Sequence, residues 1–182
     1  MADLLWHGCV VPEDLLYDVG LNVWVRLAGD TAVLGMTDVA QTLGGRMVQV
    51  SWKKSGRSYA RGRSVAVIES AKWVGPFPTP LTGELVEVNE PGFAADIAIA
   101  NRDPYGSGWL ARLRPADLAG ERHHLVDGHA AFAAYRQLID EQAAASRGEQ
   151  GADRNRPGAG QFRQIAQMQR RRRRRCQHPG LG

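Results

Sequence analysis

The sequence predicts a mainly β fold, a flattened β-barrel or sandwich with short helices and a C-terminal helix, followed by a disordered basic tail. Between residues 13 and 115, short β-branched or alternating apolar segments are separated by glycine- and proline-rich turns. This pattern fits antiparallel sheets better than a parallel sheet covered by helices. After Pro115 the apolar residues recur with a helical period instead.

These changes of pattern divide the 182 residues into four parts. Residues 1–12 are expected to be a loose or partly ordered leader, 13–115 the β domain, and 116–142 a helical appendage packed on it. From Ala143 onward the chain offers almost nothing to bury, so residues 143–182 are expected to form a disordered arginine-rich tail. One domain with an appendage is what a chain of this length favours.

Each element of the β domain follows from its local pattern. Thr37 or Asp38 can cap a short helix over residues 37–43, and two glycines end it. Residues 95–101 can form another short helix, after a turn over 90–93. The expected strands cover residues 15–18, 23–27, 31–35, 47–52, 64–68, 83–88 and 109–114.

Two helical stretches are expected beyond the β domain. The first opens with a proline, which suits the first turn of a helix. Asp127 can cap the second. In this second stretch Phe132, Tyr135, Leu138 and Ile139 fall on one face, which would clamp the helix onto the sandwich.

The net charge of +4 is unevenly distributed along the chain. Residues 1–142 contain thirteen Lys and Arg against seventeen Asp and Glu, whereas residues 143–182 contain ten arginines against two acids. The body is therefore acidic, which does not suggest a nucleic-acid-binding fold. The unbroken run from Arg170 to Arg175 would bind any polyanion without specificity, and no specific nucleic acid is expected as a partner.

Cysteine and histidine positions give no metal or redox signature. Cys9 and Cys176 lie near opposite ends without metal-type spacing, and His123 and His124 lack a supporting Cys or carboxylate pattern. The start does not read as a signal peptide, and no long apolar run occurs. The sequence therefore predicts a cytoplasmic protein with free thiols, no metal site and no membrane partner.

Lys72 is the residue that singles out a candidate site. It lies in the segment Glu-Ser-Ala-Lys-Trp (residues 69–73), between two expected strands and at a turn. The chain has only two other lysines, Lys53 and Lys54, in a separate turn. An exposed amine at a turn is a good attachment point for a carrier arm, although an ordinary solvated lysine fits the same pattern.

A self-similarity flanks this lysine. Residues 45–50 and 83–88 share the order glycine, polar, apolar, valine, polar, valine. Because a lone β-ribbon cannot bury its apolar face, two like strands suggest a quasi-symmetric pair of small sheets.

Four motifs in order resemble the glycine cleavage system H protein, a lipoyl carrier, over residues 16 to 115. Gly-Met-Thr-Asp-Val-Ala-Gln (35–41) is similar to the family's glycine, apolar, Thr-Asp-Tyr-Ala-Gln run. Val-Ile-Glu-Ser-Ala-Lys (67–72) is similar to its Val-Val-Glu-Ser-Val-Lys lipoylation segment. Gly-Glu-Leu-Val-Glu-Val-Asn-Glu (83–90) and Asn-Arg-Asp-Pro-Tyr-Gly-Ser-Gly-Trp-Leu (101–110) complete the set.

The resemblance implies a lipoyl-domain-like fold and a covalent lipoate on Lys72. By the same match, Glu69 is the acidic neighbour that lipoyl-attaching enzymes require. The family's arm carries an aminomethyl group from glycine decarboxylase to aminomethyltransferase, and dihydrolipoyl dehydrogenase reoxidises the dithiol. The cofactor does the chemistry, so the resemblance implies a non-catalytic carrier subunit rather than an enzyme.

The sequence departs from this family at several positions. Asn22-Val23 replaces the usual His-Glu, and Trp73 stands where a small residue is common. Lys53-Lys54 stands where members of the family usually have acidic residues and proline. The basic segment that follows, residues 57–63, is either a solvated edge or a docking patch for an acidic partner.

These departures leave two further hypotheses. Ala-Lys-Trp-Val-Gly-Pro (71–76) and the opening around Cys9 resemble H-like lipoate-binding proteins that carry sulfur for heterodisulfide-reductase-like sulfur-oxidation complexes. The other hypothesis is a regulatory or binding module that is not lipoylated. Modification of Lys72 separates this module from both carriers.

Overall fold

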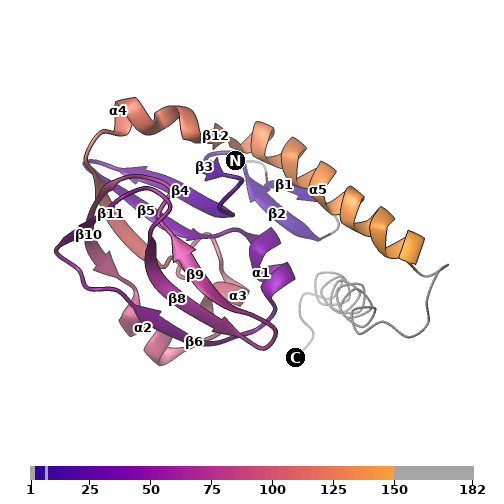
Figure 1. Cartoon of the computed structure of the whole chain (residues 1–182), viewed down its shortest axis with the longest axis horizontal. Coiled ribbons are helices and arrows are strands. Elements are labelled where there is room, and N and C mark those ends of the chain that lie inside the picture. The colour runs from indigo at the N-terminus through magenta and orange to yellow at the C-terminus, as the bar shows by residue number, and fades with distance from the viewer. Residues whose placement is uncertain (1–2, 7, 150–182) are drawn as a thin grey trace, which may run out of the picture.

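The computed structural model describes residues 3–6 and 8–149, and in them a mainly β fold of two facing sheets with helices around them (Figure 1). Every strand pair is antiparallel. The larger sheet contains, in spatial order, β12 (Val126–Asp127), β3 (Leu16–Asp18), β4 (Val23–Ala28), β5 (Thr31–Met36), β11 (Ala111–Pro115), β10 (Gly83–Val88) and β7 (Arg57–Tyr59). The smaller sheet contains β6 (Met47–Trp52), β8 (Ser64–Ser70) and β9 (Val74–Pro78).

Five α-helices and one 3₁₀ turn are described. The short helices are α1 (Asp38–Gly44), α2 (Glu90–Ala95), α3 (Ile99–Arg102), α4 (Leu118–Glu121) and the 3₁₀ turn η1 (Arg122–His124). The long helix α5 (Gly128–Glu149) packs beside the N-terminal hairpin, which consists of β1 (Asp3–Trp6) and β2 (Cys9–Pro12) (Figure 1). None of the helices in the described ranges is long and apolar enough to cross a membrane.

The larger sheet separates two hydrophobic cores. Along β4, Val23 and Val25 point into the core shared with the smaller sheet, while Trp24 between them points into the core under α5 and the hairpin. All three are fully buried. Burial on both faces explains why the first three residues of this strand are all apolar, whereas the exposed second half contains Arg26.

One glycine is required by this packing. A Cβ on Gly35 would lie 2.5 Å from the ring of Trp24, which faces it across the β4–β5 pair. Glycine therefore leaves the space that the indole fills, and the indole Nε1–H then donates to the carbonyl of Pro104 at 2.8 Å.

The C-terminal helix packs as its periodicity predicts. Tyr135 is buried in the second core, and Phe132, Leu138 and Ile139 pack against it. The Asp127 carboxylate accepts from the Ala130 N–H at 2.9 Å, which confirms its capping role. The helix runs on to Glu149, past Ala143, where the sequence predicted disorder to begin. The six-arginine run lies outside the described residues.

Three other expectations were wrong in detail. The segment expected to be a loose or partly ordered leader contains the hairpin β1–β2, whose Cys9 and Val11 are buried in the second core. The turn expected over 90–93 is the first part of α2, since Pro91 suits a first helical turn. The two self-similar segments do lie in different sheets, β6 and β10, but these sheets have three and seven strands. Each sheet is open, which confirms the sandwich form of the expected fold rather than the barrel form.

Candidate functional site

Lys72 lies at the tip of the β8–β9 hairpin, as the sequence predicted. The Ser70 N–H donates to the Trp73 carbonyl at 2.8 Å, which leaves only Ala71 and Lys72 in the loop. The Ala71 N–H donates to the carbonyl of Arg46 at 3.0 Å. The Lys72 side chain is exposed. A tight turn fixed on both sides therefore presents the amine to solvent.

The hydroxyl of Ser70 fixes this turn from inside. Its Oγ donates to the carbonyl of Gly44, the last residue of α1, at 2.6 Å, and accepts from the N–H of Trp73 at 3.1 Å. Ser70 is 9% exposed, so its hydroxyl makes both bonds from a buried position. The serine thus joins the lysine turn to the end of a helix from another part of the chain.

The end of α1 forms the floor beside the lysine. Thr37 caps the helix by accepting from the Ala40 N–H at 3.2 Å, and Gly45 ends it with a φ of 80°. A Cβ on Gly45 would lie 3.7 Å from Cδ of Lys72, so the stem of the lysine passes directly over this glycine. Sequence reasoning assigned the two glycines only to helix termination, and this contact with the lysine was missed.

Glu69 lies on the outer face of the smaller sheet. Its cross-strand neighbours are Gln49 on β6 and Val74 on β9. Glu69 is exposed, and Val74 is 63% exposed. The carboxylate and the Lys72 amine are therefore both accessible, and an exposed valine lies across from the carboxylate.

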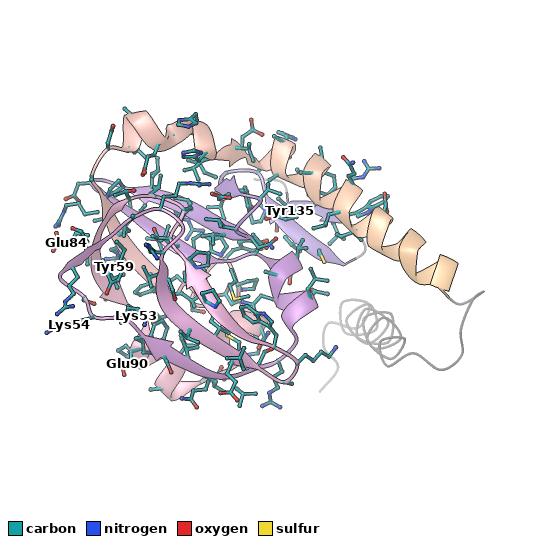
Figure 2. All side chains as sticks on the ribbon, in the orientation of Figure 1. Lys53, Lys54, Tyr59, Glu84, Glu90 and Tyr135 are labelled. Atoms are coloured by element: carbon teal, nitrogen blue, oxygen red, sulfur yellow. The ribbon has the colours of Figure 1, made fainter. Side chains whose placement is uncertain are left out.

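The two other lysines lie at the opposite end of the smaller sheet. Near the lysine turn, Met47 pairs with Ser70, and Lys53 follows β6 at its far end. Figure 2 places Lys53 and Lys54 together at the edge away from α1. Tyr59 donates to the Lys54 carbonyl at 3.1 Å, so this turn is stabilised on its own. The tight hairpin tip distinguishes Lys72 from both.

A groove opens beside the lysine turn, between the smaller sheet, α1 and the loop before β4. Its volume of about 430 Å³ lies within the range of about 300–1,000 Å³ that is common for small-molecule sites. None of the described residues that line it is acidic. The lining consists of Gly20, Leu21, Asn22, Met36, Ala40, Leu43, Gly44, Ile68, Lys72, Trp73, Pro76, Phe77 and Pro78.

The motif over residues 101–110 supports the site from behind. Asn101 donates from Nδ2 to the carbonyl of Gly45 at 3.1 Å and accepts from the N–H of Met47 at 2.9 Å. It therefore connects the end of α1 to the start of β6. The Tyr105 hydroxyl accepts from the N–H of Asp38 at 2.9 Å, at the other end of the helix. Both ends of α1 are thus held by this one segment.

The remaining candidates stay apart from this site. Cys9 is buried, with its thiol 3.7 Å from the hydroxyl of Thr42. His123 and His124 contact each other on η1, and His123 bonds to the Gly120 carbonyl. No group of three His, Cys, Asp or Glu that could hold a metal ion is found in residues 3–6 and 8–149. Cys176 lies outside the described residues.

Comparison with known proteins places this chain beside glycine cleavage H proteins. A family model described as Glycine cleavage H-protein matches residues 15–138. "Glycine cleavage system H protein 2" of Aquifex aeolicus is 39% identical, and the alignment covers 75% of this chain and 85% of that protein. "Glycine cleavage system H protein 5" of the same organism is also 39% identical, over 75% of this chain and 94% of that protein. The Thermus thermophilus "Glycine cleavage system H protein" is 35% identical over 73% and 98%.

A solved structure agrees with these matches. The crystal structure of a glycine cleavage system H protein from Mycobacterium marinum superposes with a TM-score of 0.59 and 29% sequence identity. The alignment covers 66% of this chain and 95% of that chain. The matched family region includes the lysine hairpin, α1 and the motif over residues 101–110 that holds both ends of α1.

Proposed function

The chain belongs to the glycine cleavage H-protein family, and on this basis we propose that it is a lipoyl carrier whose attachment residue is Lys72. The observation that carries the proposal is the exposed lysine at a two-residue hairpin tip, locked by Ser70 to the end of α1. A carrier must present its arm from a rigid post, because a loose loop would lose conformational entropy each time a partner binds.

The residues around Lys72 fit a lipoyl group. An amide on the lysine removes its charge, and the apolar groove beside it suits an arm of methylenes that ends in a disulfide ring. The lipoyl group would supply a dithiol–disulfide pair that can hold a transferred group on sulfur. The chain itself would orient the arm, through Gly45 under the lysine stem and Ser70 under the turn.

Recognition by the lipoyl-attaching enzymes would depend on Glu69 and the hairpin together. Glu69 faces outward three residues before the lysine, and no corresponding carboxylate precedes Lys53 or Lys54 at that spacing. As an H protein, the chain would exchange an aminomethyl group with glycine decarboxylase and aminomethyltransferase, and dihydrolipoyl dehydrogenase would reoxidise the arm. The chain would act as a carrier subunit and not as a catalyst.

A second cargo is supported by the groove. An aminomethyl group carries a primary amine, and a protonated amine buried in a groove without a carboxylate is costly. No described lining residue is acidic, and Asn22-Val23 occupies the place of the family's usual His-Glu pair. An uncharged sulfur cargo for a heterodisulfide-reductase-like complex fits this lining better. Two differently numbered H proteins of one organism are among the relatives, which is consistent with more than one carrier role.

One experiment tests both cargoes and the carrier itself. The protein is isolated from its native host, and the peptide containing Lys72 is mapped by mass spectrometry under non-reducing conditions. A lipoyl adduct on Lys72 is expected. An additional aminomethyl mass would support the glycine cleavage role, and additional sulfur the second role. An unmodified Lys72 in cells that lipoylate other proteins would contradict the carrier proposal and favour a module without lipoate.

A further inference from the structure

Trp73 lies on the groove side of the lysine hairpin. Trp73 directly precedes β9, along which Gly75 and Phe77 share one face, and the Trp73 ring lies where a Cβ of Gly75 would point. Phe77 is buried in the core. Gly75 pairs with Ile68, another buried residue. The ring of Trp73 is therefore on the inner face of the hairpin, although the residue is 42% exposed.

The ring fills the space that Gly75 leaves empty. A Cβ built on Gly75 would collide with Cζ2 and the neighbouring ring atoms of Trp73. The backbone of Trp73 is fixed as well, since its N–H donates to the Ser70 hydroxyl at 3.1 Å and its carbonyl accepts from the Ser70 N–H at 2.8 Å. The indole thus lies against the hairpin at Gly75, in a defined position next to Lys72.

The same ring lines the groove. Trp73 and Lys72 are both part of its wall, and most of the other side chains there are apolar. Trp73 can therefore pack against the hairpin and line the groove at the same time, because different parts of the residue make the two contacts. Divalent sulfur makes favourable contacts with aromatic rings at about 5 Å.

We propose that Trp73 is a positioning residue for the disulfide-bearing end of the arm on Lys72. The arm rotates freely about its single bonds on both sides of the amide, so it can fold back from the hairpin tip into the groove. There the indole forms the wall against which the dithiolane ring packs and is shielded from solution. This inference rests on the proposed function, since it requires a lipoyl group on Lys72.

The first test is tryptophan fluorescence of the lipoylated full-length protein. A disulfide in contact with an excited indole quenches its emission, so the oxidised lipoylated form should be dimmer than the unmodified form. Opening the ring with tris(2-carboxyethyl)phosphine, which takes oxygen from water as the disulfide becomes two thiols, should restore the emission. Trp73→Phe should abolish the difference. Trp6→Phe, in which the changed residue does not line the groove, should retain it.

The second test keeps the indole but moves it. In Gly75→Ala the new methyl group must displace the exposed ring of Trp73, so the quenching should be lost while all five tryptophans remain. The pseudo-first-order rate of dithiolane opening by the phosphine should rise several-fold in both Gly75→Ala and Trp73→Ala.

The outcomes separate this inference from the function on which it rests. Absence of the lipoyl mass on Lys72 contradicts both. A lipoylated protein with equal emission in the oxidised and reduced forms contradicts only the role of Trp73, which would then simply cover the hairpin. Quenching that persists in Trp73→Phe assigns the contact to another tryptophan and also overturns the inference.

Discussion

The Ser70 hydroxyl donates a hydrogen bond of 2.6 Å to the carbonyl oxygen of Gly44, which joins the lysine hairpin to the end of α1. The same oxygen accepts from the N–H of Trp73. One buried hydroxyl therefore satisfies a helix-terminal carbonyl and a turn amide together. The orientation of Lys72 relative to the groove depends on this joint.

Ser70→Ala should destabilise the protein and loosen the hairpin. The Gly44 carbonyl and the Trp73 amide lose their partner in a partly buried joint, so the free energy of unfolding should fall by about 1–3 kcal/mol. Urea unfolding followed by circular dichroism measures the change. Ser51→Ala, on the exposed outer face of β6, is the matched control and should stay within about 0.5 kcal/mol of the parent. Equal effects of the two changes would contradict the assigned role of Ser70.

Lys72→Arg should eliminate lipoylation and leave the fold intact. The side chain is exposed at a turn, so the free energy of unfolding should change by no more than about 0.5 kcal/mol. Intact mass after co-expression with a lipoyl-attaching enzyme should show no adduct. Lys53→Arg and Lys54→Arg, each tested alone, should be modified like the parent. An adduct that survives in Lys72→Arg would move the attachment point elsewhere.

Glu69→Gln should slow lipoylation without altering stability. The carboxylate faces solvent between Gln49 and Val74, so its loss removes charge from the docking surface and leaves the core unchanged. The initial rate of adduct formation should fall about tenfold, as expected for a lost charge-assisted contact of about 1.4 kcal/mol. Glu90→Gln, an exposed position in the first turn of α2, is the control. If both variants were modified at the parent rate, recognition would depend on the hairpin alone.

Much of this site was predictable because it is coded locally. The β-branched run before Glu69 and the glycine and prolines after Lys72 define a hairpin from residues that are near in sequence. Thr37 at the start of α1 and Asp127 before α5 could also be predicted, since a capping side chain bonds to an N–H three residues ahead.

The missed features depend on contacts between distant segments. The Ser70–Gly44 bond spans 26 residues, and no periodicity reports that a helix end will meet a hairpin tip. The N-terminal hairpin was mistaken for a leader because its strands are short. The Tyr105 hydroxyl donates to the Val10 carbonyl at 2.6 Å over 95 residues. These bonds appear only when the chain is folded.

Tyr105→Phe should weaken the attachment of the N-terminal hairpin and change its response to alkali. Burial raises the pKa of Tyr105 above its ordinary value, so the phenol stays protonated in the folded protein where it ionises in the unfolded chain. Its contribution to stability is therefore fully present below the unfolded pKa of about 10 and is lost as the pH rises from there toward the folded pKa. Removing it should make the loss of stability above pH 10 less steep by about 1.4 kcal/mol per pH unit.

At pH 7 the same variant should be less stable than the parent. The Val10 carbonyl loses its donor and the Asp38 amide its acceptor, at a cost of about 1–3 kcal/mol each if no water replaces the hydroxyl. Urea titrations at several pH values from 7 to 11 measure both effects. Tyr59→Phe, which removes a hydroxyl whose hydrogen bond is exposed, is the control at pH 7. A variant that is weaker at pH 7 but has the parent's alkaline slope would show that Tyr105 acts only through its hydrogen bonds. The raised pKa of Tyr105 would then contribute nothing to the stability of the contact between β2 and residues 101–110, the motif that supports α1.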